Sequence, residues 1–236
     1  MERDGKDNHH LINLVINGQC VLRTNYRLLM QIAPDYFGLL FSQESYTEKE
    51  PKDISLILPV DVDVSTAKRL LENLLNSEDP FDEHKTGVPL AQLLVTANHF
   101  GLAEIAGKCA ERLELIVNRD NCCYLWKLAN SCDQPKLGRR AASELFQCDL
   151  HSLGTSETFL EYSRDEFSWF LSHESLTAQN EKDIFSLIIS WCQFDKGLRW
   201  NVDVFTTLSK LHWDQLVEDL DSLTGKSHDP LLLSSL

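Results

Sequence analysis

PDYFGLLFSQESYTE, residues 34–48, is the most informative stretch of this sequence. Four of its apolar residues fall at i, i+1, i+4 and i+5: Tyr36, Phe37, Leu40 and Phe41. This spacing places them on one stripe of a helix. Beyond the stripe the segment turns polar but keeps one large aromatic residue, Tyr46, two residues before Glu48. An aromatic side chain among Ser, Thr, Gln and Glu has no evident core to enter, so we predict that it contacts a protein partner.

Strand-like runs lie on both sides of this stretch. Residues 11–16 (LINLVI) and 19–22 (QCVL) are joined by Asn17-Gly18. Asn-Gly between apolar runs is the strongest short-range hairpin signal, because both central residues of a type I′ turn need positive φ. A third strand is expected at residues 54–59.

Helices are expected between and after these strands. The first is capped by Thr24 or Asn25 and runs to residue 33, and a short aromatic helix follows over residues 36–41. We expect the first helix to place three apolar residues on one face: Leu28, Leu29 and Ile32. Further amphipathic helices are predicted from residue 65 to about 117, with Gly101 ending one of them in the left-handed conformation.

After residue 118 no strand pattern returns, and the second half is expected to be an array of helix pairs. Residues 122–129 form one amphipathic segment, and Pro135 suits the first turn of the next helix. Ser163-Arg-Asp-Glu166 is a capping box, and Asn180 can cap a later helix. A last helix pair is expected over residues 204–223.

Composition indicates a folded protein of the cell interior. The chain has 236 residues, of which 43% are hydrophobic and 25% charged, and no apolar run approaches the roughly 18 residues of a membrane span. No secretory signal opens the sequence. Seven scattered cysteines without Cys-x-x-Cys spacing argue against a disulfide framework and a zinc ribbon. The net charge of −14 and the scattered basic residues argue against nucleic-acid binding.

Catalytic and cofactor signatures are missing from the sequence. It has no phosphate-binding Gly-rich loop, no dinucleotide-binding Gly-x-Gly-x-x-Gly and no Gly-x-Ser-x-Gly elbow. The histidines do not form a ligand cluster, and His99, at a predicted helix end, is expected to be structural. We therefore predict no enzyme, no metal site and no cofactor.

The order of elements resembles a BTB/POZ domain followed by a BACK domain, as in the N-terminal half of Kelch-like substrate adaptors. The BTB resemblance is carried by NLVING (13–18), LLM (28–30), PDYFGLLF (34–41) and LLVTANHFGL (93–102). The BACK resemblance is carried by NCCYLWKLAN (121–130), FLEYSRDEF (159–167) and EKDIFSLIISWC (181–192). The implied fold is an α+β BTB/POZ domain (11–117), with a short mixed sheet and flanking helices, followed by an all-α BACK array (118–236). Residues 1–10 are expected to form a disordered tail.

This resemblance implies a protein–protein adaptor that bridges a cullin-3 E3 ubiquitin ligase to a target protein, in the cytoplasm or the nucleus. In such adaptors a hydrophobic-x-Glu motif after the short aromatic helix contacts the N-terminal region of cullin-3, and Tyr46-Thr47-Glu48 fits it. The first helix pair of the BACK half would form a second clamp. The implied contact residues are Phe41, Tyr46, Glu48, Leu125 and Trp126.

The sequence also departs from the family pattern. Where BTB domains commonly carry an Asp before the first strand and a His after the second, this chain has Leu11 and Asn25 or Tyr26. A BTB homodimer is implied, but the long helix that usually helps to form it has only the polar residues 1–10 in its place. Kelch repeats, a MATH domain and zinc fingers are missing, so the substrate is held either outside these residues or by the BACK half itself.

Two alternatives remain at this point. The chain could be an assembly scaffold that uses the fold without cullin, through residues 11–16 or the BACK groove. It could instead be a BTB transcriptional co-regulator, although no DNA-reading motif is present.

Overall fold

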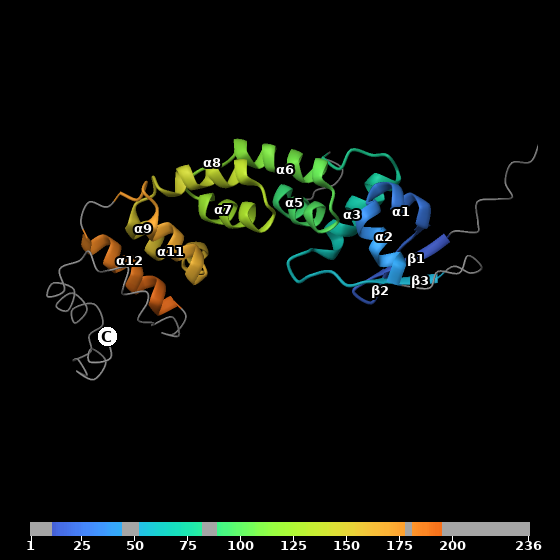
Figure 1. Cartoon of the computed structure of the whole chain (residues 1–236), viewed down its shortest axis with the longest axis horizontal. Coiled ribbons are helices and arrows are strands. Elements are labelled where there is room, and N and C mark those ends of the chain that lie inside the picture. The colour runs from blue at the N-terminus through green and yellow to red at the C-terminus, as the bar shows by residue number, and fades with distance from the viewer. Residues whose placement is uncertain (1–10, 44–51, 82–88, 178–180, 195–236) are drawn as a thin grey trace, which may run out of the picture. The chain divides into compact units, whose positions relative to one another are not determined.

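The computed structural model of the chain describes residues 11–43, 52–81, 89–177 and 181–194 (Figure 1). Its three strands are β1 (Leu11–Ile16), β2 (Gln19–Asn25) and β3 (Lys52–Leu56), in the order β2-β1-β3. β1 pairs antiparallel with β2 and parallel with β3, so the sheet is mixed, as predicted.

The predicted hairpin is confirmed at the turn between β1 and β2. Asn17 has φ 47° and Gly18 has φ 81°, the two positive values that this turn needs. β1 alternates in burial, with Ile12, Leu14 and Ile16 at 0% exposure, so one face of the sheet belongs to the core.

Helix α1 (Tyr26–Ile32) begins after Asn25, whose side chain accepts a hydrogen bond from the Arg27 backbone N–H. Of the two predicted caps, Asn25 is therefore the one used. The predicted shared face is wrong in one member, because Leu29 is fully buried whereas Leu28 is 43% exposed. Successive residues of a helix are rotated by about 100° around its axis. When Leu29 points into the core, Leu28 therefore points away from it.

The aromatic helix α2 (Pro34–Gln43) is longer than the predicted 36–41 at both ends. Its Pro34 fits the first turn, where a missing N–H costs no intrahelical hydrogen bond. Phe37 is fully buried and stacks on Phe100, with ring centroids 6.1 Å apart.

Three more helices complete the N-terminal elements: α3 (Val64–Leu75), α5 (Leu90–His99) and α6 (Ala103–Leu115). α5 packs against both α3 and α6. Gly101, between α5 and α6, has φ 69°, which confirms the predicted left-handed end.

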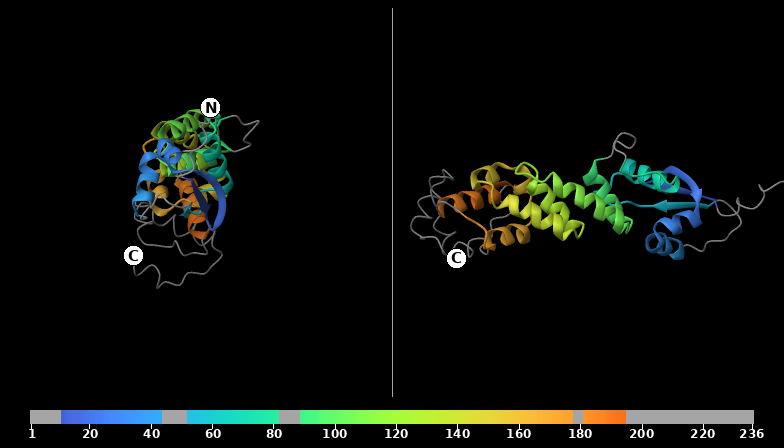
Figure 2. Two further views of the ribbon diagram at one scale, coloured as in Figure 1. Left: turned by 90° about the vertical axis from the view of Figure 1, so that its right-hand side faces the viewer. Right: turned by 90° about the horizontal axis from the view of Figure 1, so that it is seen from above.

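Every regular element among the described residues after 118 is a helix. These helices are α7 (Cys122–Ser131), α8 (Pro135–Leu145), α9 (Leu150–Thr155), α10 (Glu157–Leu160), α11 (Arg164–Ser172) and α12 (Glu181–Phe194). Figure 2 shows these elements from two further directions. Pro135 opens α8 and the capping box at Ser163 opens α11, as predicted. The short helices α9 and α10 were not predicted, and Asn180 and the pair at 204–223 lie outside the described residues.

The described residues divide into two compact units. The first comprises those within Met1–Val117 and Leu125–Arg139, and the second those within Asn118–Tyr124 and Arg140–Leu236. Residues from α7 and α8 therefore join the N-terminal elements, whereas the predicted division at 117/118 places both helices with the second half.

An aromatic core holds the second unit together. Phe167 stacks on Trp191 with centroids 4.5 Å apart, and Phe159 packs against Tyr162 and Phe170. The Tyr162 hydroxyl donates to the Cys123 backbone carbonyl at 3.0 Å, which ties the first turn of α7 to this core.

None of the helices among the described residues has the length and apolar character needed to cross a membrane.

Candidate protein interaction surfaces

Phe41 is the described member of the predicted contact around the aromatic helix. It is half-buried near the end of α2, where its ring meets Tyr26 edge-on at 5.9 Å and stacks on Phe37 at 6.0 Å. Tyr46 and Glu48, the other two residues, lie outside the described residues, so their contact stays a prediction. Leu39, which sequence reasoning did not select, is 67% exposed on the same helix.

The predicted residues of α7 face inward. Leu125 is 3% and Trp126 6% exposed, and Tyr124, which was not selected, is 45% exposed. An amphipathic pattern identifies the buried stripe of a helix, and both predicted residues belong to that stripe. A direct contact of Leu125 or Trp126 with cullin-3 stays a prediction. Tyr124 is a large residue that this helix exposes to solvent.

A polar pair joins α2 to α5. The Tyr36 hydroxyl and His99 Nε2 are 3.0 Å apart, and the Tyr36 ring also packs edge-on against Phe100. Burial lowers the pKa of His99 despite the opposing charge of Asp61, and burial raises the pKa of Tyr36. His99 therefore has the structural role that the sequence predicted.

Leu11 faces Asn25, one of the two candidates for the second departure from the BTB pattern. The β1–β2 register pairs Leu11 with Asn25, and Asn25 uses its side chain to cap α1. An apolar residue opposite a capping amide cannot supply the acid–histidine pair that the family pattern would place there.

The second unit contains a pocket of about 670 Å³. It is formed by the loop before α7, the loop between α8 and α9, the start of α9 and residues near α12. Its lining includes Arg119, Phe146, Cys148, His151 and Asp183. The volume lies in the range of roughly 300–1,000 Å³ that is usual for ligand pockets.

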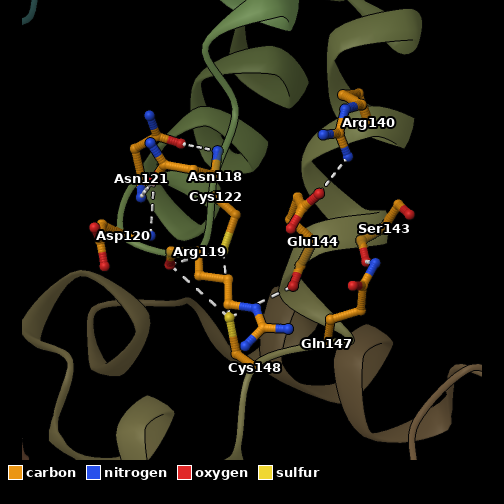
Figure 3. Close-up of polar contacts among 10 residues, drawn as sticks. All are labelled: Asn118, Arg119, Asp120, Asn121, Cys122, Arg140, Ser143, Glu144, Gln147 and Cys148. Atoms are coloured by element: carbon orange, nitrogen blue, oxygen red, sulfur yellow. Dashed lines mark hydrogen bonds and ion pairs between the residues drawn. The ribbon is translucent and has the colours of Figure 1, made fainter.

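Thiol hydrogen bonds fix one wall of this pocket (Figure 3). The Arg119 backbone carbonyl accepts from Cys122 Sγ at 3.3 Å and from Cys148 Sγ at 3.9 Å, and the two sulfur atoms are 3.7 Å apart. Burial raises the pKa of Cys148 to about 12, so its thiol stays protonated at neutral pH. A protonated thiol is a weak hydrogen-bond donor and a poor nucleophile, so this wall suits binding rather than covalent catalysis.

Several charged residues around the pocket have partners within the protein. Asp149 accepts hydrogen bonds from the Ser152 backbone N–H and hydroxyl, which lower its pKa, and Asp183 already interacts with another group. Glu144 pairs with Arg140 at 2.6 Å. Within the described part of the chain, no carboxylate pairs with the Arg119 guanidinium, so its positive charge is available to a ligand.

Neither this pocket nor Arg119 was predicted. Arg119 lies next to two asparagines and an aspartate, in a pattern that indicates only a polar helix start. The residues of the pocket are up to 64 positions apart, from Arg119 to Asp183, so no local spacing could have grouped them.

Comparisons with known proteins find similar sequences over most of the chain. Residues 122–221 match the family model described as BACK, BTB And C-terminal Kelch. Kelch-like protein 40 of Xenopus tropicalis is 26% identical over 198 residues, covering 84% of this chain and 31% of the relative. Kelch-like protein 41b of Danio rerio is 24% identical over 220 residues, covering 89% and 34%. Kelch-like protein 3 of Pongo abelii is 24% identical over 189 residues, covering 80% and 31%. The chain thus spans about a third of the length of the curated relatives it matches.

Proposed function

We propose that this chain, a BTB–BACK protein of the Kelch-like type, is a non-enzymatic adaptor that bridges a cullin-3 ubiquitin ligase to a target protein. The match of its second half to BACK, together with Kelch-like relatives aligned over most of the chain, carries this proposal. Residues 11–117 are the proposed BTB/POZ domain. An adaptor of this kind would act in the cytoplasm or the nucleus.

The element order of the first unit supports the BTB assignment. A mixed three-stranded sheet, the short helix α1, the aromatic helix α2 and the pair α5–α6 follow one another as the resemblance implies. In the proposal, residues after α2 approach cullin-3, with Tyr46 as an apolar anchor and Glu48 as the charge that fixes register. Phe41 would support this contact from the end of α2, and α7 would contribute the second clamp.

The direct test is calorimetric titration of the chain with the N-terminal region of cullin-3. We expect a dissociation constant between nanomolar and low micromolar. The double variant Tyr46→Ala/Glu48→Ala should weaken binding by more than about 2 kcal/mol if both residues are hot spots. Phe194→Ala/Glu174→Ala is the matched control, because it likewise removes one aromatic residue and one acid, here two exposed residues of the second unit.

The outcomes separate the candidate functions. Equal affinity of the double variant and the wild type would reject the assignment of Tyr46 and Glu48 while keeping the adaptor function. No binding of cullin-3 by the wild type would reject the adaptor function itself. In that case self-association of the free chain, measured by light scattering, would favour the assembly scaffold.

A further inference from the structure

Arg119 is the one Lys or Arg among the described residues that line the pocket of the second unit. Arg119 is exposed and lines the pocket, and no carboxylate of the described ranges lies within ion-pair distance of its guanidinium. Two acids nearby have partners of their own: Asp149 accepts hydrogen bonds from Ser152, and Glu144 pairs with Arg140. A guanidinium presents a planar fork of donors that matches a carboxylate.

The rest of the wall adds an apolar surface and neutral polar groups. The Phe146 ring stacks on His173 at 4.3 Å and on Phe170 at 5.2 Å, so it is held rigidly where it lines the pocket. Gln147, also in the lining, is oriented by the hydrogen bond that its Nε2 donates to the Ser143 carbonyl at 3.0 Å. Figure 3 shows Arg119 between the Cys148 thiol and the helix that carries Glu144 and Gln147.

We propose that this pocket binds an extended peptide segment of a partner protein, with an Asp or Glu side chain on the Arg119 guanidinium and a neighbouring apolar side chain on Phe146. The volume of about 670 Å³ is enough for a few residues but not for a folded domain. A nucleic acid is a poor match, because phosphate binding needs several clustered cations, whereas Arg119 is the one Lys or Arg among the described lining residues. The inference goes beyond the proposed function, because it concerns a second partner and does not require cullin-3.

A displayed library of random octapeptides, selected on the immobilised full chain, tests the proposal even though the partner is unidentified. We expect the selected peptides to share an acidic residue next to an apolar one. A selected peptide would then be labelled and titrated by fluorescence anisotropy against wild type, Arg119→Gln and Arg119→Lys. Both variants keep the backbone carbonyl of residue 119, which accepts hydrogen bonds from the Cys122 and Cys148 thiols.

We expect Arg119→Gln to weaken binding at least tenfold and Arg119→Lys to weaken it less, because the charge remains without the planar fork. Arg23→Gln is the matched control: Arg23 is an exposed arginine of β2 in the first unit, and its replacement should change affinity less than twofold. Replacing the acid of the peptide by its amide should cost as much as Arg119→Gln. Thermal unfolding of each variant verifies that it is folded.

Three results would overturn the proposal: selected peptides without a shared acid, equal binding by Arg119→Gln, or tighter binding of single-stranded DNA than of peptide at the same pocket. Saturating cullin-3 N-terminal region should leave peptide binding unchanged. A chain that binds the peptide but not cullin-3 would therefore refute the proposed function while supporting this inference, and the reverse result would do the opposite.

Discussion

Tyr162 shows how a single buried hydroxyl can hold separate parts of a helical array together. Its hydroxyl donates to the Cys123 carbonyl at 3.0 Å, and its own carbonyl accepts from Trp191 Nε1 at 2.9 Å. Burial raises the pKa of the phenol, so it stays a neutral donor. Tyr162→Phe leaves the Cys123 carbonyl buried without this donor, and we expect a loss of about 1–3 kcal/mol in the free energy of unfolding.

Urea unfolding followed by circular dichroism measures this loss. Ser175→Ala is the control at an exposed position outside any helix, where a change within about 0.5 kcal/mol is expected. An equally small change for Tyr162→Phe would show that water or a rearranged neighbour replaces the lost donor.

The burial of His99 leads us to expect that the free energy of unfolding depends on pH. Burial lowers its pKa in the folded state from the ordinary value of 6.5, so the unfolded chain binds the proton more readily. The stability contributed by neutral His99 is therefore present above about pH 6.5 and is lost as the pH falls through the lower folded-state value.

We expect His99→Gln to reduce the difference between the unfolding free energies at pH 7.5 and pH 5.5. His151→Gln, which removes an exposed histidine, should keep the wild-type difference. If the wild type and His99→Gln lose the same stability on acidification, His99 does not control this pH dependence.

Among the elements, α11 is the one whose start was predicted in full. The Ser163 hydroxyl accepts from the Glu166 N–H at 3.3 Å, and Glu166 Oε2 accepts from the Ser163 N–H at 2.7 Å. Ser163→Ala should lower the free energy of unfolding by about 0.5–2 kcal/mol, because a helix-terminal N–H loses its acceptor. Ser175→Ala, outside any helix, is the control for the measurement by chemical denaturation. No loss in Ser163→Ala would mean that the packing of Phe167 and Phe170 alone fixes this end.

Helices and strands could be predicted where a side chain determines the conformation of the neighbouring backbone. They could not be predicted where contacts between distant segments determine it. Asn17-Gly18 and Ser163 each determine the backbone within a few residues, so the sequence alone located the hairpin and the cap. α9 and α10 span six and four residues, too few for a helical period to appear, and tertiary packing sustains them. The apolar pattern of α7 identified Leu125 and Trp126 but could not tell the buried stripe from a binding face.

At the scale of the whole molecule, the order of elements could be predicted but the sites could not. Each helix or strand is indicated by the pattern of neighbouring residues, so the order of elements follows from the sequence alone. The pocket instead depends on Arg119, Phe146 and Asp183 meeting across three separate segments. The predicted cullin contact at Tyr46 and Glu48 rests on the sequence pattern and the resemblance, because those residues lie outside the described part of the chain.

The division between the two halves gives the last prediction. The sequence places it at 117/118, whereas Leu125–Arg139 groups with the first unit. Leu125, Trp126, Leu128 and Leu137 are at most 6% exposed, so a fragment ending at 117 lacks the apolar groups that this segment buries in the first unit. We therefore expect residues 1–145, which retain complete α7 and α8, to unfold cooperatively at a higher urea concentration than residues 1–117. Equal midpoints for the two fragments would support the boundary that the sequence predicts, and would show that α7 and α8 add no stability to the first unit.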